Sequence, residues 1–315
     1  MVVYEVPNNL SFSQTSNLVG DYCGASYFYE RVLGKPARPG WAMLGGSALH
    51  EASETWDWAA LSEGIIDQDP RYLHRIFGEA MDKQISRTEE RTPYPKEEWN
   101  LSGRVIKTKT SLDGGPNRKD EAWWREMGPQ MLFTWTSWRL NSAWEIATFE
   151  DPENGAPVVG IETEYWTEIG PAPSHGFVDR VFEMMVDGVM EYLVVDLKSG
   201  REPDDTAQLG SYRLGLQRRY GINPRWGAFW LGGTGATTPL TPLRDLWPDE
   251  RVEQRYEKAR RVQLAGDFTH KPSNLCGSCG VRDYCPIAGG SKAAATVQPW
   301  SKEVTIQVAP PKSVA

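Results

Sequence analysis

Two aspartates and a lysine stand in an otherwise apolar stretch, VDRVFEMMVDGVMEYLVVDLKSG. Its Asp187-Gly188 dipeptide is typical of a two-residue hairpin turn, in which both residues adopt positive φ. Strand pairing continued outward from this turn places Asp179 opposite Asp196, with Cβ atoms about 4.5 to 5.5 Å apart. Lys198 lies on the same strand face as Asp196, because side chains alternate between the two faces. The hairpin therefore predicts a patch of two acids and a lysine, in which the repulsion between the carboxylates requires an offsetting charge.

The four cysteines of the chain form a second chemical group. Cys276, Cys279 and Cys285 lie together in NLCGSCGVRDYCP, whereas Cys23 lies near the start of the chain. The C-x2-C spacing brings two thiolates to one metal centre, and the third cysteine follows after five residues, next to Pro286. Disulfides are rare in cytoplasmic chains, so the pattern favours a four-thiolate site, either zinc or an iron-sulfur cluster, over four unrelated cysteines. Such a site would join the two ends of the domain.

The composition is ordinary for a globular protein, since 40% of the 315 residues are hydrophobic and 24% are charged. The formal net charge is -8, from 34 basic and 42 acidic residues, which gives no electrostatic case for general nucleic-acid binding. Two local basic stretches, 213–225 and 257–261, could contact nucleic acid or form solvated helix faces. There is no signal peptide and no apolar run near the roughly 18 residues of a membrane span, so we expect a cytoplasmic protein without membrane contact.

The elements that position these residues are predicted from apolar periodicity, helix caps and turn residues. Their order indicates an α/β (α+β mixed) fold with a mixed central sheet flanked by helices. The stretch WLGGTGATT lacks the ending of a phosphate-binding loop and is expected to be a turn after a strand. The expected elements are a helix over 11–34 with Ser11 or Ser13 as N-cap and Gly34 as its end, a glycine-containing loop and then a helix from about Ser47 within 41–62, helices joined by loops such as TSLDGGPNRKD over 65–145, strands from Val158 through the hairpin, a helix over 205–220, a strand over 225–233 and a helix over 249–266.

The chain is expected to form a single domain over 1–286. Within it we expect a helical insertion at about 65–145, a core at about 155–245 and the cysteine cluster at 266–286. The remaining residues, 287–315, contain Gly, Ala, Pro and Lys and are expected to form a flexible tail.

These features together resemble a known family: the RecB-like branch of the PD-(D/E)XK nucleases, and within it the CRISPR-associated and phage-encoded exonucleases with a four-cysteine iron-sulfur cluster. The resemblance covers roughly 11–60 and 155–286. Any single motif is weakly specific, but the complete set in the order of the family is strongly specific. The matching residues are Cys23 in DYCGASYFYE, His50 in LGGSALHEASE, Asp179 in GFVDRV, Asp196 and Lys198 in VVDLKSG, Gln208 and Tyr212 in QLGSY, and the final C-x2-C-x5-C.

The resemblance implies a PD-(D/E)XK restriction-endonuclease-like core and a metal-dependent deoxyribonuclease. His50, Asp179, Asp196 and the main-chain carbonyl of Leu197 would then hold Mg2+ or Mn2+, which suit oxygen and imidazole ligands. The ion would also neutralise the opposed carboxylates. Lys198 would orient or deprotonate the attacking water, or stabilise the developing phosphorane charge.

The resemblance further implies that Cys23, Cys276, Cys279 and Cys285 hold a 4Fe-4S cluster that shapes the nuclease core without taking part in hydrolysis. We therefore expect a DNA exonuclease that acts on single-stranded ends, in the host cytoplasm if the chain is phage-encoded. Protein partners in recombination, repair or CRISPR adaptation fit this setting. Other classes are a non-catalytic DNA-binding or adaptor subunit, which would usually lack the acids or the lysine, and a zinc-stabilised structural protein.

Several of these residues also have purely structural interpretations. The two aspartates could form surface ion pairs with Lys198 or Arg180, and His50 could hydrogen-bond Glu54 one helical turn away. Glu164, on the strand before the hairpin, could add a carboxylate to the site.

The supporting residues are equally open to two interpretations. Gln208 could complete a capping box with Asp205, or it could support the lysine. Tyr212 falls in an apolar stripe at helical spacing, typical of a core helix face, and could also contact DNA. Trp135 and Trp138 are at helical spacing, which favours core positions over stacking on unpaired bases.

Overall fold

The structure, a computed structural model, describes residues 2–101, 119–301 and 304–309. The helices are α1 (Phe12–Val19), α2 (Gly24–Tyr27), α3 (Trp41–Glu63), α4 (Pro70–Glu89), α5 (Glu121–Asn141), α6 (Ala207–Tyr220), α7 (Leu243–Leu246) and α8 (Asp249–Ala265). The strands are β1 (Val2–Val6), β2 (Glu145–Ile146), β3 (Thr148–Glu150), β4 (Pro157–Val159), β5 (Ile161–Ile169), β6 (Ala172–Val186), β7 (Val189–Lys198), β8 (Trp226–Leu231), β9 (Ala236–Thr237), β10 (Thr241–Pro242) and β11 (Val304–Val308). None of the described helices combines the length and the apolar character needed to cross a bilayer.

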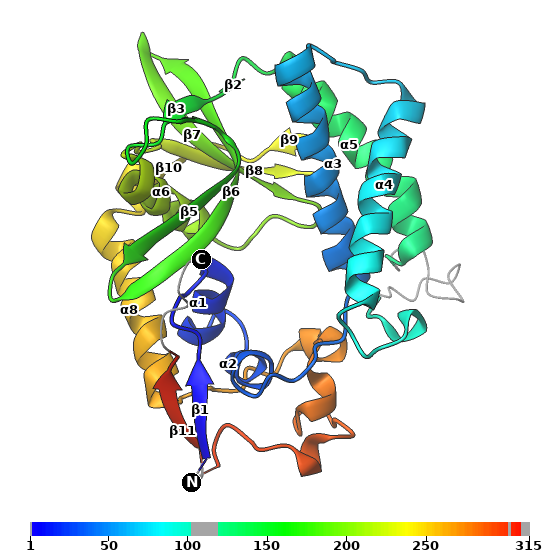
Figure 1. Ribbon diagram of the computed structural model, residues 1–315, viewed down its shortest axis with the longest axis vertical. Helices are drawn as coiled ribbons and strands as arrows, with labels where there is room; N and C mark the ends of the chain where they lie inside the picture. Colours follow the sequence, from blue (N-terminus) through cyan, green and yellow to red (C-terminus); the bar gives the residue numbers. More distant parts are fainter. Residues whose placement is uncertain (1, 102–118, 302–303, 310–315) are drawn as a thin grey trace.

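The central sheet is mixed and flanked by helices, as the sequence predicts (Figure 1). Its seven strands follow the order β10-β8-β7-β6-β2, with β5 paired to β6 and β9 paired to β8. β7 and β8 are parallel and are connected through α6, whereas β5, β6 and β7 are successive antiparallel neighbours. These antiparallel strands carry the acidic residues, so the sheet fixes the geometry of the candidate site.

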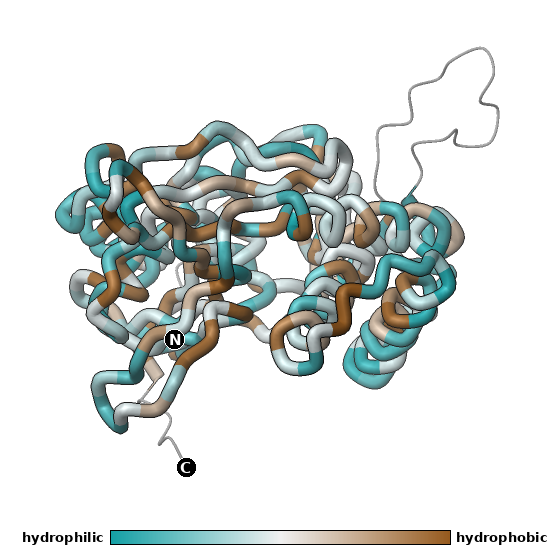
Figure 2. Tube along the Cα trace, turned by 90° about the horizontal axis from the view of Figure 1, so that it is seen from above, coloured by the Kyte–Doolittle hydropathy of each residue, from teal (hydrophilic) through white to brown (hydrophobic). Residues whose placement is uncertain are grey.

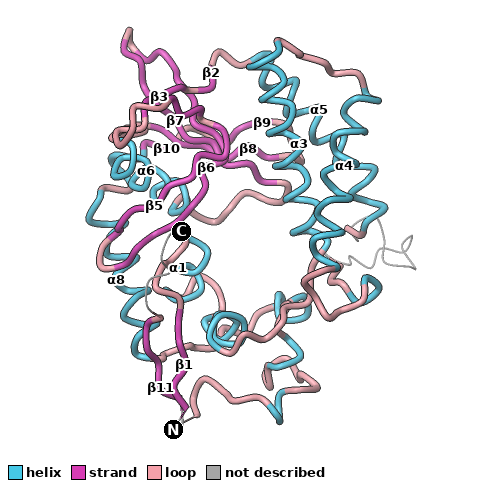
Figure 3. Tube along the Cα trace, viewed as in Figure 1, coloured by secondary structure: helices cyan, strands magenta, loops and turns pink. Residues whose placement is uncertain are grey.

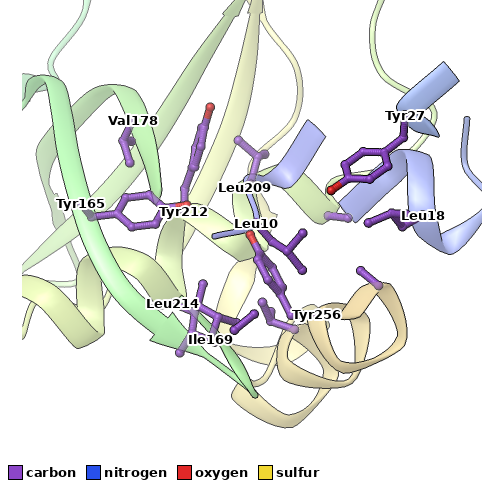
Figure 4. Close-up of a cluster of buried hydrophobic side chains, with 14 of the residues drawn as sticks. Leu10, Leu18, Tyr27, Tyr165, Ile169, Val178, Leu209, Tyr212, Leu214 and Tyr256 are labelled. Atoms are coloured by element: carbon purple, nitrogen blue, oxygen red, sulfur yellow. The ribbon is translucent and has the colours of Figure 1, made fainter. Parts of the chain in front are cut away.

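Two hydrophobic cores lie on opposite faces of this sheet. The first contains residues of α1, α6 and α8, and the second contains residues of α3, α4 and α5. Successive residues of β7 alternate between them, since Val194 belongs to the first core and Leu193 and Val195 to the second. Figure 4 shows the first core, where Tyr165 and Tyr212 lie close together. Figure 2 shows hydrophobic and hydrophilic segments alternating along the chain, as expected for elements with one buried side.

The hairpin of β6 and β7 is confirmed in both its turn and its register. Asp187 and Gly188 connect the strands with φ of 52° and 79°, so both adopt the left-handed conformation that this turn requires. Residue pairs run from Val186 with Val189 outward to Arg180 with Val195. The next step of the same register joins Asp179 and Asp196.

The helix expected over 11–34 is wrong as a single element. Ser11 is the N-cap of α1, as expected, and its hydroxyl and the Gln14 side chain form a reciprocal capping box. However, the helix ends at Gly20, which has φ of 97° and therefore the left-handed conformation of a helix terminus. Cys23 lies in the resulting break, as the N-cap residue of α2.

The start of α3 also differs from the expectation. The helix begins at Trp41, six residues before Ser47, because its glycines do not form a loop. A Cβ atom on Gly45 would lie 1.9 Å from Cδ2 of Trp124 on α5. Gly45 thus allows close contact between α3 and α5, and the glycine signal marks packing at this position rather than a chain break.

The later elements agree with the sequence more closely. α6, β8 and α8 are confirmed, and β8 is followed by a turn at WLGGTGATT as expected. The strand expected from Val158 is interrupted at Gly160, between β4 and β5. In the expected flexible tail, β11 forms a parallel pair with β1, a non-local pairing that local patterns do not show. Most of the loop TSLDGGPNRKD lies outside the described residues.

The two basic stretches act in structural ion pairs and hydrogen bonds. Arg213 lies 2.6 Å from Asp249, and Arg219 lies 2.7 Å from Asp151. Arg260 is buried, and its Nη1 donates to Gln263 at 2.6 Å. These arginines therefore connect α6 and α8 to their surroundings and do not form an open basic face.

A buried polar network connects the helices to the sheet. Asp57 of α3 is fully buried and accepts hydrogen bonds from Arg180 of β6 at 2.8 Å and Arg139 of α5 at 3.3 Å. Trp135 of α5 also donates its indole N–H to Asp57, at 3.2 Å. Trp135 is fully buried and packs against the partly buried Trp138, which confirms the core interpretation of both. One carboxylate thus unites α3, α5 and β6.

Replacing Asp57 with alanine should strongly destabilise the protein. The change leaves buried arginines without their counter-charge, and removing one partner of a buried ion pair costs about 3 to 5 kcal/mol. The matched control is Asp82→Ala, since Asp82 forms an ion pair with Arg125 on the surface and such pairs contribute less than about 1 kcal/mol. Guanidinium unfolding midpoints would measure both, and equal shifts for the two variants would contradict the prediction.

Candidate active site and metal centre

Three acidic residues occupy successive positions across β5, β6 and β7. The β5–β6 register places Glu162 opposite Asp179, and the β6–β7 register places Asp196 on the other side of Asp179. We call these three residues the acid row. Glu162 has φ of 44°, in the left-handed region that residues other than glycine rarely adopt. Such backbone strain is concentrated at functional sites, where the surrounding structure maintains it.

His50 of α3 faces the acid row from the adjacent helix. Its Nδ1 lies 3.5 Å from Oδ2 of Asp179 and 3.7 Å from Oε1 of Glu162. One ligand atom from each of these three residues lies within 4.8 Å of the others. The Nε2 atom of His50 lies 3.0 Å from the carbonyl oxygen of Leu197. The structure therefore brings together the imidazole, two carboxylates and the main-chain carbonyl.

Asp196 and Lys198 form a closed ring of polar contacts with α6. The Lys198 ammonium lies 2.5 Å from Oδ2 of Asp196 and donates to Oε1 of Gln208 at 3.0 Å. The amide of Gln208 donates to the hydroxyl of Tyr212 at 2.7 Å, and that hydroxyl donates to Oδ1 of Asp196 at 3.2 Å. Each member fixes the next, so Gln208 and Tyr212 hold the acid and the lysine in position.

The purely structural interpretations of these residues do not match the contacts. Asp179 is 6% exposed, so it forms no surface ion pair. Its Oδ2 accepts a hydrogen bond from the main-chain N–H of Leu197 at 2.6 Å. The N-cap of α6 is Thr206, and Gln208 contacts Lys198 and Tyr212, so the capping box with Asp205 does not form.

The donor set fits a hard divalent cation. Carboxylate and carbonyl oxygens suit Mg2+ and Mn2+, and an added imidazole favours Mn2+. Oδ2 of Asp196 is buried and, among the described residues, lacks a partner with hydrogen-bond geometry, although the Lys198 ammonium is close to it. An acceptor oxygen with unused lone pairs is therefore available beside the group formed by His50, Glu162 and Asp179.

Burial and mutual charge shift the titration of the site in the metal-free chain. Burial raises the pKa of Asp179 to about 7, with a further rise from Asp196 that the positive charge of His50 opposes. Burial lowers the pKa of His50, but the charges of Asp179 and Glu162 outweigh that effect and raise it to about 9. Burial also opposes the charge on Lys198, yet Asp196 and Asp179 raise its pKa above the ordinary value. Without a metal ion, protons thus take part of its electrostatic role.

Sequence reasoning missed Glu162 and named its neighbour Glu164 instead. Glu164 is on the surface, where its Oε1 contacts Nε2 of His175 at 2.8 Å. A second turn carried the missing signal. Gly170-Pro171 connects β5 and β6, and pairing continued outward from this turn places Glu162 opposite Asp179. The rule that located Asp196 from its turn therefore also locates Glu162.

The acid row opens onto a cavity of about 640 Å³, which we call the central hollow. It lies between α3, α4 and the end of β7, with His50, Glu162 and Lys198 in its wall. Glu54 of α3 also lines it, and burial followed by the charge of Glu162 raises the pKa of Glu54. The site is thus accessible to a substrate and is not sealed in the core.

The four cysteines line one cavity of about 410 Å³ and form no disulfide. Figure 3 shows that the segment after α8 is mainly loop and runs past α1 and α2, which brings its three cysteines toward Cys23. Main-chain N–H groups of Lys271 and Ser273 donate to the sulfurs of Cys23 and Cys276, each at 3.4 Å. Burial raises the pKa of the Cys279 thiol, and the charges of the other thiols raise it further.

The spacing of the sulfurs constrains what this cavity could hold. Zn–S bonds are about 2.3 Å long, so two sulfurs on one zinc ion lie at most about 4.6 Å apart. Within the described part of the chain, no three of the cysteine sulfurs are within 4.8 Å of one another. The thiols therefore share a cavity but are not gathered around the position of a single ion. Their number and their N–H···S contacts fit a larger cluster.

Affinity of the metal-free protein for Mn2+ should rise as the pH increases from about 6 to 9. A bound ion needs ionised Asp179 and neutral His50, and protons held with pKa values of about 7 and 9 compete with it below those values. Calorimetric titration at several pH values would measure both the affinity and the protons released. A flat profile would contradict the assignment of these ligands.

A matched pair of variants controls for general charge effects on this binding. Glu162→Gln should weaken Mn2+ binding at least about tenfold, because it removes one ligand oxygen charge. Glu164→Gln makes the same chemical change two residues away and should leave the affinity unchanged.

Comparison with known proteins agrees with this site. The family model described as the PD-(D/E)XK nuclease superfamily matches residues 10–286. The chain is 30% identical over 279 residues to the Gene 69 protein of Mycobacterium phage L5, which covers 84% of this chain and 92% of that protein. It is 29% identical over 166 residues to the Gene 69 protein of Mycobacterium phage D29, which covers 51% of this chain and 58% of that protein. The matched residues include the acid row, Lys198 and the four cysteines, and the chain belongs to the PD-(D/E)XK nuclease superfamily.

Proposed function

We propose that this protein is a Mg2+- or Mn2+-dependent deoxyribonuclease that hydrolyses phosphodiester bonds from single-stranded DNA ends. The observation that carries the proposal is the acid row, faced by His50 and continued by Lys198 at the wall of an open cavity. Membership of the superfamily supports the nuclease activity. The preference for single-stranded ends rests on the resemblance of the cysteine and acid motifs to the iron-sulfur exonucleases.

His50, Glu162 and Asp179 would hold the ion, with Asp196 and the Leu197 carbonyl beside them. When bound, the metal supplies Lewis acidity and lowers the pKa of a coordinated water. The chain itself keeps the ligands in place. Arg180 donates to Glu162, and the Leu197 N–H orients Asp179.

Lys198 acts as a charged group in this proposal. Because its pKa is raised in the metal-free chain, the ammonium remains protonated at neutral pH and is a poor general base. A protonated lysine would orient the attacking water and stabilise negative charge on the phosphorane. Gln208 and Tyr212 are positioning residues, since they contact Lys198 and Asp196 and fix the direction of the ammonium.

The adaptor alternative has little support from the residues. A non-catalytic subunit would be expected to lack an acid or the lysine, and all of them are present with mutual contacts. The similarity to two mycobacteriophage proteins favours a phage setting over CRISPR adaptation. Phage DNA processing in the host cytoplasm, with recombination or repair proteins as partners, is the setting we propose.

We also propose that the four cysteines ligate a 4Fe-4S cluster with a structural role. Their shared cavity, N–H···S contacts and spread beyond a single zinc ion support the cluster over zinc. Cys23 follows α1, and the other three follow α8, so the cluster would fasten these two segments of the domain together.

Replacing Lys198 with alanine should reduce cleavage by at least about 100-fold, because the charge that stabilises the transition state is lost. The assay is degradation of end-labelled single-stranded and duplex DNA by anaerobically purified protein with Mn2+, Mg2+ or EDTA. Lys258→Ala is the matched control, since Lys258 lies exposed on α8 and its Nζ donates only to Val19 O, at 3.0 Å. Full activity of the Lys198 variant would overturn the assigned role, and metal-independent or absent cleavage by the parent protein would overturn the nuclease proposal.

Replacing Cys279 with serine should abolish the broad visible absorption expected of the anaerobically purified protein and lower its iron and sulfide content together. Ser278→Ala lies one residue away, changes no thiol and should keep both signals. A colourless parent protein that contains zinc would contradict the cluster proposal.

A further inference from the structure

The central hollow continues into two further hollows on opposite sides of the acid row. It shares Met43, Ser47 and Arg87 with a cavity of about 690 Å³ beside α4, the α4 hollow. It shares Lys198 and Arg201 with a third cavity of about 400 Å³, the acidic hollow. The three cavities form one path across the molecule, with the site in the middle.

The two ends of this path differ in charge. The acidic hollow is lined by four carboxylates and only two cations, and Asp204 pairs with one of those cations, Arg201, at 3.2 Å. The α4 hollow has the opposite balance. Its charged residues are Arg38, Arg87, Arg91 and Glu30. A polyanion that crosses the site is therefore attracted on the α4 side and repelled on the other.

Two arginines of the α4 hollow remain available to a ligand. Arg38 is neutralised by Glu98 at 2.9 Å and Asp283 at 3.0 Å. Arg87 and Arg91 are exposed, and neither forms an ion pair within residues 2–101, 119–301 and 304–309.

The position of the arginine pair matches that of consecutive phosphates leading to the site. Arg87 and Arg91 lie one helical turn apart, so their side chains lie on the same side of α4 and its C-terminal extension. Arg87 lines both the α4 hollow and the central hollow, which connects the pair directly to the site. A positive charge at the end of a helix stabilises its dipole, but this effect does not require the charge to face a cavity.

We propose that Arg87 and Arg91 bind the backbone phosphates of the uncleaved part of a single DNA strand, which reaches the metal centre through the α4 hollow. The cleaved end then leaves past the acidic hollow, where its charge is repelled. This inference rests on the proposed nuclease function and adds the direction of the strand across the site. Tyr22, which is 58% exposed and lines the acidic hollow, offers an aromatic face to an unpaired base on that side.

The test is the salt dependence of DNA binding by the Arg87→Ala/Arg91→Ala double variant. Binding of a fluorescent 20-nucleotide single strand is measured by anisotropy in EDTA, so that cleavage does not consume the probe. Each phosphate contact on a single strand contributes about 0.7 to the slope of log K against log salt. Loss of two contacts should reduce that slope by about 1.4, which corresponds to about 25-fold weaker binding at 0.1 M salt if both proteins bind equally at 1 M.

The matched control is the double variant Arg71→Ala/Arg75→Ala. It removes two exposed arginines with the same spacing from the same helix, but these pair with Asp69 and Glu79 and do not line the path. Its slope should equal that of the parent protein. Equal slopes for the parent and the Arg87/Arg91 variant, or the same reduction in both double variants, would overturn the inference.

The length of the probe tests the direction of the strand. The uncleaved strand extends away from the site, so the Arg87/Arg91 variant should lose affinity for the 20-nucleotide strand and keep its affinity for a dinucleotide. An equal loss for both probes would overturn the proposed direction. Because binding is measured without cleavage, a parent protein that binds the strand but never cuts it would refute the nuclease proposal and leave this inference standing.

Discussion

The buried guanidinium of Arg180 is the interaction on which the rest of the structure depends. It donates to Asp57 of α3, to Oγ of Ser53 at 3.0 Å, to the carbonyl of Asp179 at 2.6 Å and to Glu162 at 3.3 Å. Moving a cation into the protein interior costs several kcal/mol, so it is tolerated only with a full set of partners. Those partners come from the helical layer and from two strands of the sheet. The helices and the acid row are therefore fixed relative to each other by one side chain.

This arrangement explains how the sheet tolerates three acids in a row. Arg180 neutralises Glu162 from one side, Lys198 neutralises Asp196 from the other, and Asp179 between them depends on His50. The polar ring through Gln208 and Tyr212 adds directional contacts that a charge alone would not provide. A site held in this way before the ion arrives pays little reorganisation on binding, which is the usual condition for precise metal and phosphate chemistry. Its electrostatic strain is a feature of function and not of folding.

Sequence reasoning was most successful where structure is local. The Asp187-Gly188 turn fixed the register of β6 and β7, and with it the relation of Asp179, Asp196 and Lys198. The family resemblance brought in His50, whose position against the sheet depends on helix packing that no local pattern encodes. Glu162 was within reach of the same turn rule, but its strand was read without its register. Gly45 was misread because a glycine that admits an indole and a glycine that breaks a helix look alike in sequence.

The pairing of β1 with β11 has a consequence for the order in which the molecule is made. β5, β6 and β7 are neighbours in sequence, so the acid row can assemble as soon as residues 161–198 have been synthesised. β1 must instead wait for residues 304–308, and contacts this distant in sequence form slowly because of the loop that they close. During translation the catalytic hairpins would therefore precede the closure of the domain by more than 100 residues of chain growth. A ribosome-bound intermediate would carry a formed acid row on an open scaffold, which is a state that chaperones or an early ligand could occupy.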